Sequence, residues 1–340
     1  MNKICTLIAL LCAVSIGQSQ TWQITDDLSL KEVTKVQMGF QQDFGKIKQA
    51  TDNNKPDEAQ MAIWDFQRKY PEMTGGKDWQ AYAVAELTFA KRNWKKSSEL
   101  FTAFLDEFPV SQFYNAALER EYEIATAFLN GQKRRAFKIF MIRAYDDGEV
   151  MMEKIAEKAG NSSIAHRALV TLAESFEKRY MYFDAYDVWT QVALKWPTGD
   201  SGKQSLLAMA RCMHSAYNGP DCDGSPVKSA EGYYGQYKLR YPELAAEQGI
   251  DEQITIAVDQ IAYKQYMTAE YYKKTMNSQS AAIYYGYVND TWPNTKIAPM
   301  AAKELENIKN STAVVRIKPE DKNLLWRFWH FFDFNPVEKG

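Results

Sequence analysis

The sequence predicts an all-α fold, an α-solenoid of about six stacked helix pairs followed by an extra C-terminal helix. Three observations lead to this fold class. Glycine (17) and proline (11) are sparse among the 340 residues, which favours long helices over a turn-rich β architecture. Five prolines each follow an aromatic residue, and similar residues recur at fixed distances before them. Hydrophobic residues make up 46 % and charged residues 25 %, which excludes a disordered chain and a multi-span membrane protein.

Residues 1–19 predict a secretory signal peptide, so the folded chain is expected to begin at residue 20. Lys3 precedes an almost unbroken apolar run over 4–16, and small residues at Gly17 and Ser19 offer cleavage points. An uncleaved anchor is the alternative, but this run falls short of the ~20 apolar residues that a spanning helix needs. A lipidation site at Cys12 is disfavoured because Leu11, rather than a small residue, precedes it.

The five aromatic–proline pairs predict the ends of helices that each bury one face. A small residue lies twelve positions before each proline, a large one eight before, and an apolar one five before. In chain order the three columns are Ala59, Ser97, Ala185, Ala230 and Ala281; then Ile63, Phe101, Trp189, Tyr234 and Tyr285; then Phe66, Phe104, Val192, Tyr237 and Val288. The small residue allows two antiparallel helices to approach closely, and proline cannot continue the helix.

A partner helix is expected before each of these helices, most clearly at 81–91, 168–178 and 266–274. The spacing within the pairs matches the 34-residue tetratricopeptide (TPR) pattern. Repeat units are predicted to end near Pro71, Pro109, Pro197, Pro242 and Pro293. A degenerate unit ends near Gly148 and has Ala136 and Phe140 in register. Insertions are expected at 147–161 and 218–229, and the TPR-like superhelix spans 20–310.

A right-handed superhelix of this kind has a concave face lined by the first helices of the pairs, and extended or helical peptides bind there. In the first two units we expect this face to carry Phe44, Lys48, Trp79, Tyr82, Glu86 and Phe89. The alternative for these positions is that about half of them form contacts between repeats.

Cys212 and Cys222 are the two cysteines of the mature chain, and they lie ten residues apart. In an exported protein such a pair predicts a disulfide that closes a loop. Two thiols are the alternative, and a metal site with His214 lacks a fourth ligand.

Residues 311–340 predict an extended linker and then an amphipathic aromatic helix at 323–334. Its docking residues are Trp326, Phe328, Trp329, Phe331 and Phe332. The polar residues Arg327, His330 and Asp333 recur every three positions, so most of the helix circumference is apolar. Three interpretations stand: the helix caps the last repeat, docks on a partner protein, or lies peripherally at a membrane surface.

No catalytic motif occurs in the sequence. The three histidines lack metal-site spacing, and there is no P-loop, dinucleotide fingerprint or nucleophile elbow. The balance of 41 basic against 43 acidic residues gives no electrostatic case for nucleic acid. We therefore expect a protein-binding chain that is not an enzyme and has no cofactor, no metal and no nucleic-acid partner.

Two segments resemble the BamD family, the TPR component of the machinery that inserts β-barrel proteins into the bacterial outer membrane. They are the closing repeat over 269–295, which ends in Trp-Pro-Asn-Thr, and Leu-Phe-Thr-Ala-Phe-Leu-Asp-Glu-Phe-Pro at 100–109. The resemblance covers roughly 40–310. It implies a periplasmic adaptor, peripherally associated with the outer membrane, whose partners are a barrel insertase and unfolded barrel clients. The alternative function is a TPR scaffold of another envelope complex, for the cell wall, division or secretion.

Overall fold

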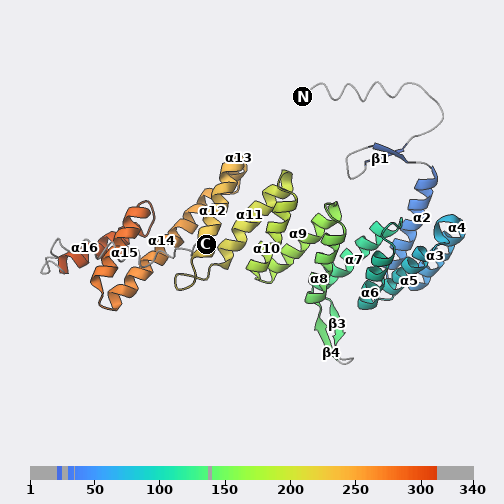
Figure 1. Cartoon of the computed structure of the whole chain (residues 1–340), viewed down its shortest axis with the longest axis horizontal. Coiled ribbons are helices and arrows are strands. Elements are labelled where there is room, and N and C mark those ends of the chain that lie inside the picture. The colour runs from blue at the N-terminus through green and yellow to red at the C-terminus, as the bar shows by residue number, and fades with distance from the viewer. Residues whose placement is uncertain (1–20, 25–29, 34, 137–139, 312–340) are drawn as a thin grey trace, which may run out of the picture. The chain divides into compact units, whose positions relative to one another are not determined.

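Helices form nearly all of the regular structure in the part of the chain described by the structure. The structure is a computed structural model, and it describes residues 21–24, 30–33, 35–136 and 140–311. Consecutive helices pack against each other in antiparallel pairs, as in a helical-repeat solenoid (Figure 1). The all-α solenoid predicted from the sequence is therefore confirmed.

The chain divides into two compact units, residues 1–197 (unit 1) and 198–340 (unit 2). The described residues of unit 1 form four helix pairs and a short helix: α2 (Lys35–Asp52) with α3 (Pro56–Lys69), α4 (Pro71–Thr74), α5 (Lys77–Ala90) with α6 (Trp94–Glu107), α7 (Tyr114–Leu129) with α8 (Tyr145–Lys158), and α9 (Ser163–Lys178) with α10 (Tyr182–Lys195). In unit 2, residues 198–311 form two pairs and two further helices: α11 (Gly199–Ala216) with α12 (Ser225–Arg240), α13 (Pro242–Glu247), α14 (Ile250–Lys274) with α15 (Ser278–Thr291), and α16 (Ala298–Ser311).

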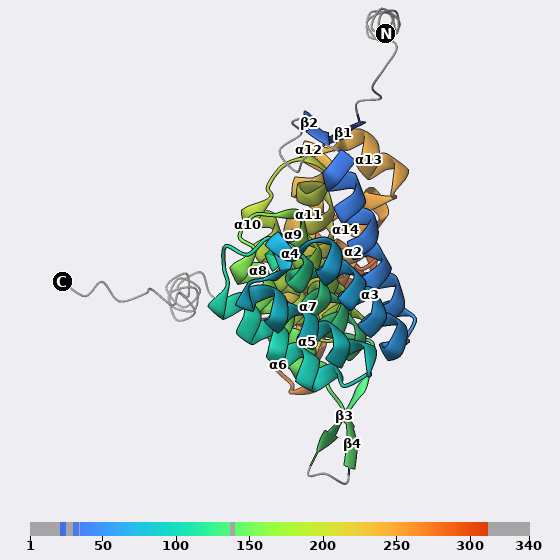
Figure 2. The ribbon, with the colours of Figure 1, turned by 90° about the vertical axis from the view of Figure 1, so that its right-hand side faces the viewer.

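Two antiparallel hairpins complete the described secondary structure. The first joins β1 (Thr21–Ile24) to β2 (Leu30–Val33), with Thr21 opposite Val33. The second joins β3 (Lys133–Ala136) to β4 (Phe140–Arg143), with Lys133 opposite Arg143. Figure 2 shows the second hairpin projecting away from the helices of unit 1.

The five aromatic–proline pairs end helices as predicted. Tyr70, Phe108, Trp196, Tyr241 and Trp292 are the C-caps of α3, α6, α10, α12 and α15. All five have φ between −124° and −136° and ψ between 57° and 70°, outside the α region that a following proline disfavours. The backbone N–H of each aromatic cap residue still donates to the backbone carbonyl four residues earlier, at 2.8–3.0 Å. The cap therefore completes the last turn while the proline stops the helix.

The three columns before the prolines form the core between the paired helices. All fifteen side chains are at most 4 % exposed, and every small residue of the first column is fully buried. Ser97 of α6 shows how close the helices come, because its hydroxyl donates to the backbone oxygen of Ala85 in α5 at 3.1 Å. The predicted role of these residues in core packing is confirmed.

The third helix pair differs from the sequence prediction. Ala136 and Phe140, expected on a helix, lie on β3 and β4, and the expected insertion at 147–161 is mostly the helix α8. Gly148 does not end a unit; it lies twelve residues before Gly160, which occupies the position of the missing proline. Met152 and Ile155 then fall in the other two columns and are fully buried. The hairpin, inserted between α7 and α8, shifted the register that the sequence analysis assigned.

Four of the first helices end in the same turn. Two residues after the helix, φ is positive at Asn54, Arg92, Tyr180 and Met276, between 57° and 62°. The N–H of each turn residue donates to the carbonyl three residues earlier, at 2.8–3.2 Å. A side chain in this left-handed region costs roughly 1–2 kcal/mol. The repeated turn sends each chain segment back into its antiparallel second helix.

A substitution at Gly148 tests how closely α7 and α8 approach each other in the third pair. A Cβ at this position would lie 2.9 Å from the backbone oxygen of Ala125 and 3.0 Å from Leu129 Cγ. We expect Gly148→Ala to lower the free energy of unfolding by about 1–3 kcal/mol, because the added methyl group would force the α7 backbone to move away from α8. Chemical denaturation monitored by circular dichroism measures the change.

Gly45 provides the matched control. It lies inside α2 with nothing within 4 Å of a built Cβ. Gly45→Ala should raise the unfolding free energy by roughly 0.5–1 kcal/mol, because alanine favours the helix. Equal effects of the two substitutions would contradict the close approach of α7 and α8.

Candidate protein-binding face

The structure buries four of the six side chains that the sequence places on an accessible concave face. Trp79, Tyr82, Glu86 and Phe89 of α5 are all less than 7 % exposed, whereas Phe44 of α2 is half-buried. The expected exposure is therefore wrong for those four, since residues of α2 and α7 cover this side of α5. These four positions form the contacts between repeats that were the alternative interpretation. Lys48, the sixth, keeps 44 % of its side chain exposed.

An aromatic cluster joins the first three helix pairs beneath this face. The ring of Tyr82 lies 5.7 Å from that of Phe44 and 5.5 Å from that of Phe113, which precedes α7. Trp79 lies 5.0 Å from both Phe66 and Phe113. Such ring pairs add to the burial of their apolar area. The cluster holds α2, α5 and α7 in fixed relative positions.

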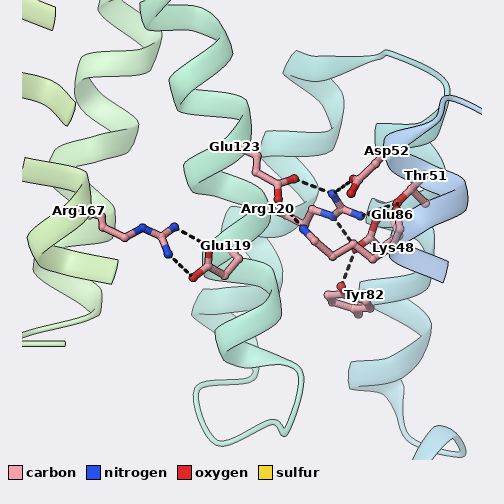
Figure 3. A network of polar contacts seen from close by, with 9 residues as sticks. All are labelled: Lys48, Thr51, Asp52, Tyr82, Glu86, Glu119, Arg120, Glu123 and Arg167. Atoms are coloured by element: carbon pink, nitrogen blue, oxygen red, sulfur yellow. Dashed lines mark hydrogen bonds and ion pairs between the residues drawn. The ribbon is translucent and has the colours of Figure 1, made fainter. Parts of the chain in front are cut away.

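Arg120 of α7 is the centre of a buried charge network (Figure 3). Its side chain is 1 % exposed, and its Nε donates to Glu86 Oε1 at 2.8 Å. One terminal nitrogen, Nη1, donates to Glu123 Oε2 at 2.6 Å and also to Asp52. The other, Nη2, donates to the Thr51 hydroxyl. The guanidinium also lies 4.5 Å from the ring centroid of Phe89, a cation–π contact.

The network keeps Arg120 charged in spite of its burial. Loss of hydration opposes the charge, but the charge of Glu86, its hydrogen bond and the charge of Glu123 outweigh this effect and raise the pKa of Arg120. Burial also raises the pKa of Tyr82, and the neighbouring Glu86 raises it further. The Tyr82 hydroxyl therefore stays protonated and donates to Glu86 Oε1 at 2.6 Å.

Glu86 depends on Arg120 and Tyr82 for its stability in the interior. Both donors bind Oε1, and Oε2 is buried with no hydrogen-bond partner among the described residues. An unpaired buried oxygen of this kind costs roughly 1–3 kcal/mol. The α5–α7 contact is therefore built around a carboxylate that cannot lose Arg120 without a large penalty.

The outer edge of the network is open to solvent and forms a row that we call the charged rim. Its members are Lys48 and Asp52 of α2, Glu119 and Glu123 of α7, and Arg167 of α9, whose side chains are 34–45 % exposed. Lys48 pairs with Glu123, and Arg167 binds Glu119 through two hydrogen bonds of 3.1 and 2.7 Å. The Arg167 guanidinium also lies 4.5 Å from the ring centroid of Tyr122. Figure 3 shows the two groups of ion pairs on α7.

The rim presents charged groups on rigid helices. The hydrogen bond with Glu119 raises the pKa of Arg167, so the Arg167 guanidinium stays charged across the physiological range. Exposed ion pairs contribute little to stability, because water hydrates the same charges in the unfolded chain. Such pairs can therefore exchange partners with a bound polar segment at low cost.

A second polar feature lies on the other side of α7. Glu121 is 2 % exposed, and its Oε1 accepts a 2.6 Å hydrogen bond from the hydroxyl of Thr102. Thr102 lines a pocket formed by α6, α7 and α8, together with Asp106 and Lys154. Burial raises the pKa of Glu121 to about 7, against the lowering effects of Thr102, Lys154 and Lys158.

The structure does not join the two cysteines. Cys212 is buried within α11, whereas Cys222 is exposed in the loop before α12, and neither forms a disulfide. The predicted disulfide is therefore wrong, because the Cys212 side chain packs inward near Tyr234 while Cys222 lies at the surface. The Lys264 ammonium closes the loop instead, by donating to the carbonyls of Pro220, at 2.9 Å, and Cys222.

Two predicted segments lie outside the described residues. They are the signal peptide and the aromatic C-terminal segment with Trp326, Phe328, Trp329, Phe331 and Phe332. Within the described ranges, no helix is both long and apolar enough to span a membrane. The same ranges contain no group of three or more His, Cys, Asp or Glu side chains arranged to hold a metal ion.

Sequence reasoning missed Arg120, Glu123 and Arg167. Arg120 lies on α7, the helix before the inserted hairpin. The sequence analysis assigned the wrong register to this pair, so it did not predict which side of α7 is buried. One signal was available: Arg120 and Glu123 are three residues apart, a spacing that pairs opposite charges on one helix face. No family model matches the chain, and no curated protein matches its sequence.

Replacing Arg120 tests the buried network. Arg120→Met should lower the free energy of unfolding by about 3–5 kcal/mol, because Glu86 is left buried without its counter-charge. Adding Glu86→Met should recover most of that loss, because both charges are then gone. Equilibrium denaturation of the three proteins measures this coupling, and additive losses in the double variant would refute it.

Glu121 predicts a pH dependence of stability. Its pKa is about 7 in the folded chain and about 4.5 when unfolded, so the folded form holds an extra proton between these values. The stabilisation from this group is complete below pH 4.5 and is lost as the pH rises through 7, a change of roughly 3 kcal/mol in the free energy of unfolding.

The variant Glu121→Gln isolates this effect. Gln keeps the acceptor for Thr102 but cannot ionise. Its stability relative to the parent protein should rise between pH 5 and pH 8 in denaturation curves. A difference that stays constant over that range would show that Glu121 does not titrate there.

Proposed function

We propose that this protein is an exported adaptor that binds extended segments of other proteins on the first-helix face of unit 1. Its role is in the assembly of outer-membrane β-barrel proteins, and it works by binding rather than by catalysis. The observation that carries the proposal is the charged rim, five partly exposed charges on the first helices α2, α7 and α9 beside a rigid buried network.

The chemistry of the rim suits an extended polar segment. Side chains of an extended strand alternate between two faces, and barrel strands alternate polar and apolar residues with this period. The polar face of such a segment can pair with Lys48, Glu123 and Arg167, which lie on α2, α7 and α9. A solenoid supports this mode of binding, because its stacked first helices present a long continuous surface.

The link to barrel assembly is supported by the sequence resemblance to BamD. The segments that carry it, 100–109 and 269–295, contribute the buried columns of α6 and α15 and so belong to the repeat framework. These buried residues cannot contact a partner, so the choice of partner depends on exposed residues such as those of the charged rim. A periplasmic location follows from the predicted signal peptide and from the partners that the resemblance implies.

Site-specific cross-linking in intact cells of the native host tests the proposal. A photo-reactive amino acid replaces Lys48 in the full chain, and cross-linked partners are identified by mass spectrometry. We expect an outer-membrane barrel insertase or unfolded barrel proteins. The substitution removes only an exposed ion pair, so the fold is expected to persist.

Lys46 is the matched control position. It lies on α2 two residues from Lys48, on the opposite side of the helix, and its side chain is 69 % exposed. Equal cross-linking from both positions would reject the rim as the binding face. Cross-links from Lys48 to cell-wall, division or secretion proteins would move the function to a scaffold of another envelope complex.

A further inference from the structure

The first helix of the last pair, α14, carries an exposed apolar stripe. Ile256, Tyr263 and Tyr271 are 38, 37 and 63 % exposed, and the partly buried Met267 lies between the two tyrosines. Spacings of seven and four residues put these side chains on one side of the helix. The ring of Tyr263 stacks on that of Tyr266 at 6.3 Å, which fixes its orientation.

Polar contacts border this stripe on both sides. Toward α16, Asp259 accepts a hydrogen bond from the backbone N–H of Lys296, and Lys273 pairs with Glu304 at 2.6 Å. Toward α11, Gln260 lies 3.0 Å from His214 Nε2, and Lys264 binds the loop carbonyls. An apolar strip with a polar border is the usual composition of a docking surface.

The residues after α16 contain a segment whose composition fits the stripe. Residues 324–334 contain eight large apolar side chains, namely Leu324, Leu325, Trp326, Phe328, Trp329, Phe331, Phe332 and Phe334. The stripe consists of aliphatic and aromatic side chains, so contact with this segment removes apolar area from water on both sides.

The connecting residues are long enough to reach the stripe. Glu304 lies beside Lys273, so the end of α16 at Ser311 lies about 10 Å beyond this point and Tyr263 about 15 Å before it, at 1.5 Å per helical residue. The axial separation is thus about 25 Å, and a sideways helix spacing of about 10 Å at right angles to it gives a straight-line distance of roughly 27 Å. Residues 312–323 can extend to about 40 Å. Figure 1 shows α14, α15 and α16 at the end of unit 2.

We propose that residues 324–334 of this chain dock on the apolar stripe of α14 formed by Ile256, Tyr263, Met267 and Tyr271. This contact goes beyond the proposed function and does not depend on it, because it forms within the purified chain without any partner.

Cross-linking in the purified full-length protein tests the contact. Benzoylphenylalanine replaces Tyr263, and after irradiation and proteolysis the cross-linked peptides are identified by mass spectrometry. We expect cross-links to residues 324–334. Mixing isotopically light and heavy protein before irradiation separates cross-links within one chain from those between two copies.

Tyr287 of α15 is the matched control, a tyrosine 42 % exposed that does not belong to the stripe. Benzoylphenylalanine there should give no cross-link to residues 324–334. Cross-links from position 263 to another copy, or to no part of residues 324–334, would overturn the proposal.

Amide hydrogen exchange gives a second readout in solution. Tyr263→Glu should lower the protection of residues 324–334 by about tenfold, because a charge replaces part of the apolar surface, whereas Tyr287→Glu should leave it unchanged. The substituted side chains are both partly exposed, so neither variant is expected to unfold. Unchanged protection in Tyr263→Glu would also overturn the proposal.

If the segment stays accessible in the purified protein and becomes protected only on added lipid vesicles, a membrane surface is its binding site instead.

Discussion

The close approach of two antiparallel helices within each pair is the constraint on which the rest of this structure depends. It requires a small residue at one position of every second helix, and Ala59, Ala185 and Ala281 are fully buried there. The large residues four and seven positions later fill the space that the close contact leaves on either side. Gly148 meets the same requirement in the third pair, against the backbone of α7. If this distance increased, the aromatic caps and the contacts between neighbouring pairs would all lose their register.

The sequence predicted the elements that repeat and missed those that do not. The helix ends at the five aromatic–proline pairs and the buried columns before them could be predicted, because each position requires the same kind of side chain in every pair. The third pair could not be assigned correctly, because Gly160 replaces the proline and a hairpin separates its two helices. Spacing also identifies which side of a helix is apolar, but not which neighbour covers it. This is why Trp79, Tyr82 and Phe89 were expected on an open face and are buried instead.

The first-helix faces of the two units differ in chemistry. In unit 1 an arginine is buried among carboxylates, and the charges around it reach the surface as ion pairs on rigid helices. In unit 2 the corresponding helix α14 presents tyrosines and an isoleucine at its surface. A buried charge network fixes relative helix positions more narrowly than apolar packing, since a misplaced partner leaves a charge unpaired. Unit 1 therefore has a face suited to selective polar contacts, and unit 2 a face suited to less specific apolar contacts.

The position of the β3–β4 hairpin shows where this architecture can accommodate extra residues. The α7–α8 connection spans residues 130–144, against 91–93 for α5–α6, yet α7 and α8 still form an ordinary pair. Loop closure becomes only about 0.6 kcal/mol more costly for each doubling of length, so a fivefold longer connection costs little more than about 1 kcal/mol. The turn inside a pair can therefore lengthen over evolutionary time without altering the stacking period. In protein engineering, the same turn is a natural position at which to insert a foreign peptide.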